Sequence, residues 1–122
     1  METSQMLRQL VKTLIETTRE GRVEWAADES DGPDSDTFML SLTRGSVFVW
    51  SVDNDGAHPF VFQVRGARGQ VVERIETTRP FEEGQEWTPL EDDIRKLYDL
   101  ARRSALNIDE VLTQMINDLR SK

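Results

Sequence analysis

The residue types that carry most enzyme and metal chemistry are scarce in this chain of 122 residues. It contains no cysteine and a single histidine, His58, which lacks the spaced acidic or cysteine partners of a metal-ligand set. Disulfides, thiolate catalysis and sulfur-bound zinc are therefore excluded. The sequence DNDG at 53–56 resembles the start of a calcium loop, but the twelfth ligand would fall on Phe62, so we expect a hairpin turn. We expect His58 to be a surface residue beside this turn.

Catalytic constellations of other kinds are also missing from the sequence pattern. No serine or threonine lies in a nucleophile elbow, and no glycine-rich phosphate loop opens a helix. Glu73 and Glu76 fall on opposite faces of a predicted strand, so spacing alone does not bring them together. We therefore expect no enzyme activity and no catalytic, cofactor-binding or metal-binding residues. A hydrolytic enzyme is the least favoured alternative.

Four arginines form a candidate basic patch. Arg65 and Arg68 bracket the turn RGARG, and Arg102 and Arg103 are adjacent near the end of a predicted helix. Nucleic-acid-binding proteins gather such residues on one face. The alternative is ordinary surface charge, because the helix pair suits the negative end of the helix dipole. Nucleic-acid binding is therefore kept only as an alternative, together with binding of a small ligand.

Aromatic residues on two neighbouring predicted strands form a candidate interaction surface. The set consists of Phe48, Trp50, Phe60 and Phe62. These side chains could be absorbed into the core, or they could form an exposed apolar patch that marks a protein partner or a second copy of the chain. The strand 46–52 has apolar side chains on both faces, so both faces need a cover.

The negative charge of the chain is concentrated in two segments. The formal net charge is −8, yet residues 28–36 carry five acids and residues 80–93 carry six, with no base in either. The remainder therefore sums to +3, and any partner that approaches these two segments is expected to be basic. The N-terminus lacks the features of a secretory signal and no apolar run is long enough to span a membrane, so we expect a cytoplasmic protein.

The elements that must position these residues follow from the hydrophobic period. A 3.6-residue period over 4–19 predicts an amphipathic helix, and 22–26 could form a short strand that carries Trp25. From 37 to 78 the period falls to two, which is typical of antiparallel hairpins. The predicted strands lie near 37–43, 46–52, 59–65 and 70–77.

Two further helices are predicted towards the C-terminus. Residues 88–91 (TPLE) form a capping box, and the second helix then buries a stripe consisting of Leu90, Ile94, Leu97, Tyr98, Ala101 and Ala105. Asn107 or Asp109 is expected to cap the third helix. Its stripe consists of Ile108, Val111, Leu112, Met115, Ile116 and Leu119. We expect these helical stripes to bury against the sheet.

The pattern resembles that of a loose class of small uncharacterised bacterial α+β proteins. The matching residues are Leu10, Leu14, Ile15, Thr18, Gly21 and Trp25, followed by Leu97-Tyr98, Ala101-Arg102-Arg103 and Ala105-Leu106. The resemblance implies a bacterial cytoplasmic origin and implies no activity. Twelve arginines against three lysines are compatible with a GC-rich genome, such as an actinobacterial one.

These observations predict a single α+β domain over 1–122, with an N-terminal helix, a four- or five-stranded antiparallel meander and two C-terminal helices. We expect a non-enzymatic interaction or accessory module, of an immunity type or self-associating, that binds a basic protein or a second copy. Of the two ways to cover the outer face of 46–52, we slightly favour one of the chain's own helices over a homodimer.

Overall fold

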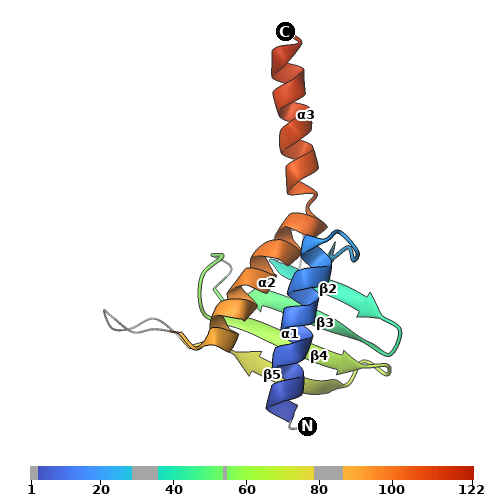
Figure 1. The fold of residues 1–122 in the computed structure, drawn as a ribbon, viewed down its shortest axis with the longest axis vertical. Helices are drawn as coiled ribbons and strands as arrows, with labels where there is room; N and C mark the ends of the chain where they lie inside the picture. The colour runs from blue at the N-terminus through green and yellow to red at the C-terminus, as the bar shows by residue number, and fades with distance from the viewer. Residues whose placement is uncertain (1–2, 29–35, 54, 79–86) are drawn as a thin grey trace.

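The computed structural model describes residues 3–28, 36–53, 55–78 and 87–122 (Figure 1). It confirms the α+β prediction: one helix, an antiparallel sheet of five strands in the order β1-β2-β3-β4-β5, and two further helices. The elements are α1 (Thr3–Arg19), β1 (Ala26–Ala27), β2 (Thr37–Leu42), β3 (Gly45–Ser51), β4 (Phe60–Gly66), β5 (Val71–Glu76), α2 (Pro89–Ala105) and α3 (Ile108–Arg120). No helix of these described residues is long and apolar enough to cross a membrane.

The register of the sheet decides which side chains reach the core. Val49 pairs with Phe38 on one side and with Phe62 on the other, so these residues share the inner face. Phe48 and Trp50 alternate with them on the outer face of β3, as the two-residue period requires. The inner residues join one continuous core cluster with the helices, whereas Phe48 does not belong to it.

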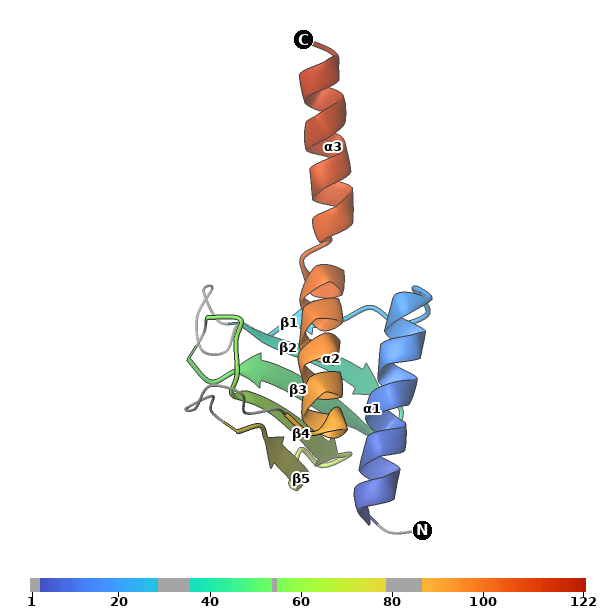
Figure 2. The same ribbon diagram turned by 60° about the vertical axis from the view of Figure 1, so that its left-hand side comes forward.

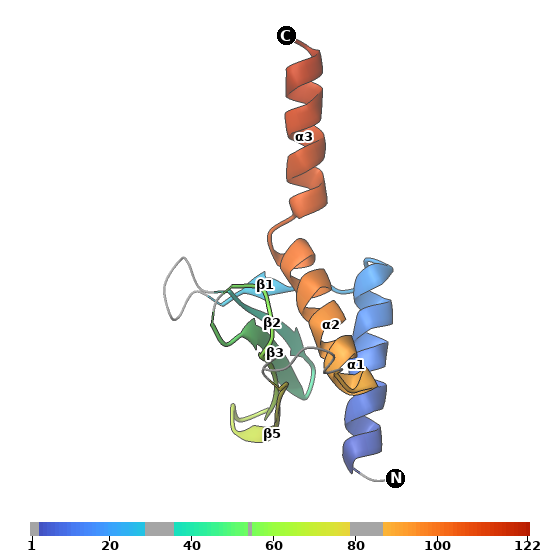
Figure 3. The same ribbon diagram turned by 90° about the vertical axis from the view of Figure 1, so that its left-hand side faces the viewer.

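Helices α1 and α2 lie on the same side of the sheet, with α2 nearer to it (Figures 1, 2 and 3). Helix α2 contacts β1, β2, β3 and β4, and α1 packs mainly along α2. The predicted stripe of α2 is confirmed, because Ile94, Leu97, Tyr98 and Ala101 are all buried. Among the described residues no helix lies on the outer face of the sheet, so the favoured prediction that one of the chain's own helices covers that face of 46–52 is wrong.

Trp25 joins the two packed helices. The prediction of a strand over 22–26 that carries it is wrong. The strand comprises only Ala26–Ala27, and Trp25 lies just before it, almost fully buried. Its indole Nε1–H donates to the Thr18 hydroxyl of α1 at 2.9 Å, and its backbone N–H donates to the Ser104 hydroxyl of α2 at 2.9 Å. A buried tryptophan normally finds a partner for its N–H, so this side chain fixes the end of α1 against α2.

The start of α2 is fixed by the predicted capping box. The Thr88 hydroxyl accepts from the Glu91 N–H at 3.2 Å, and the Glu91 carboxylate accepts from the Thr88 N–H at 3.0 Å. The second oxygen of Glu91 accepts from the backbone and hydroxyl of Thr78, just after β5. One carboxylate therefore both caps the helix and ties it to the sheet.

Gly45 occupies a position where no larger residue fits. It pairs with Leu42 on one side and with Gly66 on the other, and a Cβ atom there would lie 2.3 Å from the Arg65 carbonyl oxygen. We expect Gly45→Ala to lower the free energy of unfolding by about 1–3 kcal/mol, because the backbone must move to relieve the clash. Denaturant unfolding measures this loss. Ser46→Ala, on the next residue, is the control, and an equal loss in both variants would contradict the clash.

Candidate interaction surface

Helix α3 carries an apolar face that nothing in the described structure covers. None of its residues is buried, and Leu119, Met115 and Leu112 are 71%, 58% and 52% exposed. The expectation that this stripe buries against the sheet is therefore wrong. The helix instead extends away from the sheet and from α1 (Figures 1 and 2). Five of the thirteen residues of α3 are large, apolar and exposed: Val111, Leu112, Met115, Ile116 and Leu119.

The direction of α3 is set at Asn107, between the two C-terminal helices. Asn107 adopts the left-handed conformation (φ 50°, ψ 43°), which asparagine tolerates better than most residues, and the main chain turns there. Of the two predicted caps, Asn107 and Asp109, the structure has Asn107 at the N-cap position. Its side chain makes no capping hydrogen bond. Across the junction the Arg103 guanidinium donates to the Asp109 carboxylate at 3.1 Å. Both side chains are exposed, so this pair contributes little to stability.

The stripe of α3 follows from its sequence spacing. Apolar residues recur at intervals of three and four, which places them along one side of the helix. The opposite side is polar and includes Glu110 and Asn117. Acids occupy the first turn, Asp109 and Glu110, and Arg120 lies in the last turn, an order that suits the helix dipole.

The four aromatic residues of the predicted interaction surface lie on two opposite faces of the sheet. Phe60 and Phe62 are at most 1% exposed and belong to the core, so including them in a surface patch was wrong. Phe48 and Trp50 lie on the outer face. Phe48 is itself only 6% exposed, and the Arg65 guanidinium lies over its ring at 4.2 Å, in a cation–π contact. Trp50 is half-buried, so these two side chains offer little free apolar surface.

The four arginines of the candidate basic patch do not form one face. Arg68 lies in the β4–β5 turn, at an end of the sheet that is distant from the C-terminal end of α2 in Figures 1 and 2. Arg102 and Arg103 lie at that helix end. Arg65 is engaged by Phe48 and by the Gln63 side-chain oxygen, which accepts from its Nε–H at 2.8 Å. Two separate pairs replace the predicted patch.

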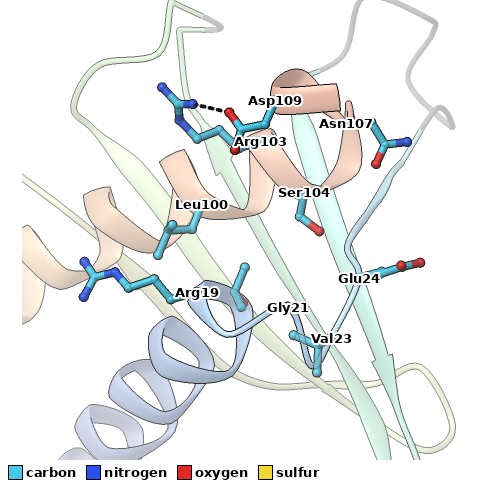
Figure 4. Close-up of a pocket in the computed structure, with 10 residues that line it drawn as sticks. Arg19, Gly21, Val23, Glu24, Leu100, Arg103, Ser104, Asn107 and Asp109 are labelled. Carbon is cyan, nitrogen blue, oxygen red and sulfur yellow. Dashed lines mark hydrogen bonds and ion pairs between the residues drawn. The ribbon is translucent and has the colours of Figure 1, made fainter. Parts of the chain in front are cut away.

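A pocket of about 410 Å³ lies between the end of α1 and the α2–α3 junction (Figure 4). Its hydroxyls, Thr18 and Ser104, already accept hydrogen bonds from Trp25, and Arg103 is paired with Asp109. Figure 4 shows Arg19 and Glu24 pointing in opposite directions. The polar groups therefore do not converge on one point, as they do in most ligand sites.

His58 is embedded rather than exposed, so its predicted surface position is wrong. Its ring stacks on Trp87 at a centroid distance of 4.1 Å and meets the edge of Phe60 at 4.9 Å. The Thr77 hydroxyl accepts from the Phe60 N–H and is hydrogen-bonded to His58 Nδ1 at 2.8 Å. Burial lowers the pKa of His58, opposed by Glu91 and Asp92 and reinforced by Arg95.

Other predicted sites are structural turns or lie outside the described residues. The Asp55 carboxylate of the DNDG turn accepts from the Ser51 hydroxyl and the Ala57 N–H, which confirms the turn. Among the residues described, no group of three acidic, histidine or cysteine side chains could hold a metal ion. Most of the two acidic segments falls at 29–35 and 79–86, outside the described ranges.

Comparisons with known proteins give this chain no family. No protein-family model matches it, and no curated protein or solved structure is significantly similar.

The lowered pKa of His58 predicts that acid destabilises the fold. The unfolded chain takes up the proton first, so stability is full above pH 6.5 and decreases as the pH falls through 6.5 towards the pKa of the folded state. We expect the melting temperature to fall between pH 7.5 and about pH 5.5, and His58→Phe to remove most of this fall.

Glu91 contributes to acid sensitivity in a separate pH range. Burial would raise its pKa, but hydrogen bonds from Thr88 and Thr78 outweigh burial and lower the pKa below 4.5. Its stabilising effect is therefore lost only below pH 4.5. An unchanged pH dependence of melting in His58→Phe above pH 5 would show that His58 does not cause the loss.

Proposed function

We propose that the protein is a non-enzymatic, cytoplasmic protein-binding module whose contact element is the apolar stripe of α3. The observation that carries the proposal is an amphipathic helix without a single buried residue, attached to a body that is otherwise well packed. A monomeric protein rarely exposes a continuous apolar face without a partner for it. A cysteine-free chain also suits a reducing compartment.

The free energy available at the stripe is substantial. Burial of one large aliphatic side chain stabilises by about 1.5–3 kcal/mol, and five such side chains are exposed on α3. A helix of thirteen residues is marginal in isolation, since isolated helices shorter than about 12–15 residues are barely stable in water. A partner that covers the stripe would therefore stabilise both the helix and the complex.

The charge of α3 favours a protein partner over a membrane or a nucleic acid. Residues 108–122 carry three acids and two bases, whereas helices that bind at membrane surfaces are rich in lysine and arginine on the polar face. A nucleic acid also requires a basic surface, and the two arginine pairs of the chain lie apart. A groove or helix of another protein requires only a matching apolar face.

The absence of enzyme activity in this proposal rests on how the reactive groups are held. The imidazole of His58 is packed between Trp87 and Phe60 and does not line the pocket. Burial, and then the charge of Asp36, raise the pKa of Tyr98 to about 12, so its phenol is no base at neutral pH. Neither His58 nor Tyr98 lines the pocket, and both rings pack against other aromatic rings.

Photocrosslinking in the cells that express the gene tests this proposal. A benzophenone amino acid at Met115 samples the stripe, and the same probe at Asn117 samples the polar side of the helix. We expect a protein adduct from position 115 and none from 117. The adducted protein, once purified, should bind wild type and Asn117→Glu but not Met115→Glu, since both variants add the same charge and only one disturbs the stripe.

Stability separates a contact surface from a packing surface. Met115 is 58% exposed and lies outside the core, so we expect Met115→Glu to change the free energy of unfolding by no more than about 0.5 kcal/mol, as at other exposed sites. A loss of several kcal/mol, or equal adducts from both probe positions, would refute the proposed role of α3.

A further inference from the structure

We infer that the partner of α3 is α3 of a second copy, packed antiparallel about a twofold axis that passes near its midpoint. This inference rests on the proposed function and specifies the occupant of the same stripe. Two-fold dimers are the commonest oligomers, and their interface uses the same patch on both subunits. The stripe of α3 has the spacing, the charge and the accessibility that such a patch requires.

The spacing of the stripe is symmetric about the centre of the helix. Reversing the order of the apolar positions, by pairing 108 with 119, 111 with 116 and 112 with 115, gives the same set of positions. An antiparallel second copy therefore places an apolar residue opposite every apolar residue. Positions 108, 112, 115 and 119 alternate at four and three residues, the repeat of a paired-helix seam.

The charges of α3 and of Lys122, two residues after its end, favour the antiparallel arrangement. Residues 108–113 carry Asp109 and Glu110, a charge of −2, whereas Asp118 and Arg120 in the helix together with Lys122 give 114–122 a charge of +1. Antiparallel packing puts the acidic half of each copy beside the basic half of the other. It also opposes the two helix dipoles, whereas parallel packing would place like charges and like dipole ends together.

The charge of the rest of the chain also favours the antiparallel arrangement. Residues 1–107 carry −7 of the net −8, so two bodies repel each other when they are close. A helix of thirteen residues is about 20 Å long, and antiparallel packing places the two bodies at its opposite ends. That separation exceeds the screening length of about 8 Å at physiological ionic strength. Parallel packing would bring the bodies side by side.

The dimer is small, so it should dissociate on dilution. Each helix offers fewer than four turns, and such an interface lies at the low end of the areas found in specific complexes. The α2–α3 junction extends it, because Leu106 is 43% exposed and lies two residues before Ile108. Leu119 of the second copy would approach this junction.

Sedimentation of the purified full chain tests self-association. We expect wild type to pass from monomer to dimer as the concentration is raised, with Asn117→Glu unchanged. Met115→Glu removes a buried apolar contact from each copy and should raise the Kd of the dimer at least about tenfold. Melting curves show that the variant remains folded. A wild type that stays monomeric at every concentration overturns the inference.

Cysteine crosslinking tests the orientation, because the chain has no cysteine of its own. In the antiparallel dimer, position 108 of one copy lies opposite position 119 of the other. Positions 108 and 119 are about 16 Å apart along one helix, so the two cysteines of an Ile108→Cys dimer, or of a Leu119→Cys dimer, are too far apart for a disulfide, which needs Cα atoms within about 7 Å. We expect little crosslinking within either variant alone and rapid heterodimer crosslinking when the two are mixed. Crosslinking within each variant alone would show parallel packing and overturn the antiparallel arrangement.

The two proposals fail in different ways. A monomeric wild type whose position 115 crosslinks to a different, identified protein removes the self-association but leaves α3 as a protein-binding element. Absence of any adduct from position 115 in cells, together with a monomeric purified protein, removes both.

Discussion

The packing of α2 is the constraint on which the arrangement of this protein depends. One side of the helix fills the inner face of the sheet, and α1 covers another side, so Ile94, Leu97 and Ala101 are completely buried. The sheet has one inner face, and a single helix contacts four of its five strands. The helix α2 holds that position together with α1, and α3 leaves the body at Asn107.

The outer face of the sheet does not offer α3 an alternative site. Val61 is fully buried there and Phe48 nearly so, with Arg65 lying over the Phe48 ring. The hydrocarbon part of an arginine can cover apolar surface while its charge remains in water. A strand with two apolar faces therefore needs neither a helix nor a second sheet to bury its outer phenylalanine. Of the eleven exposed large apolar residues in the described structure, five lie on α3.

The sequence predicted the helices and the four main strands, but it did not predict the short strand before Thr37 correctly or which elements pack together. Period, capping and turn chemistry predicted α2 and its box at Thr88, because these signals depend on residues close together in the chain. The same periodicity predicted the stripe of α3 correctly but assigned it to the core, since an apolar face indicates a need for cover and not what provides it. Phe60 and Phe62 were grouped with Phe48 and Trp50 for a similar reason: only the register of β3 with β4 shows that the two pairs lie on opposite faces.

The exposure of α3 would couple its own stability to the proposed partner. Short isolated helices are marginal because each turn gains little free energy beyond the conformational entropy that it loses. Within the body, Trp25 and the Glu91 box compensate for that cost at α1 and α2, whereas the side-chain contact that the described residues give the start of α3 is the exposed Arg103–Asp109 pair. In the proposed complex, binding would contribute the free energy that orders this helix, which would lower the net affinity relative to a rigid surface of the same area. A contact of this kind forms and dissociates readily, and its occupancy follows the concentration of the partner.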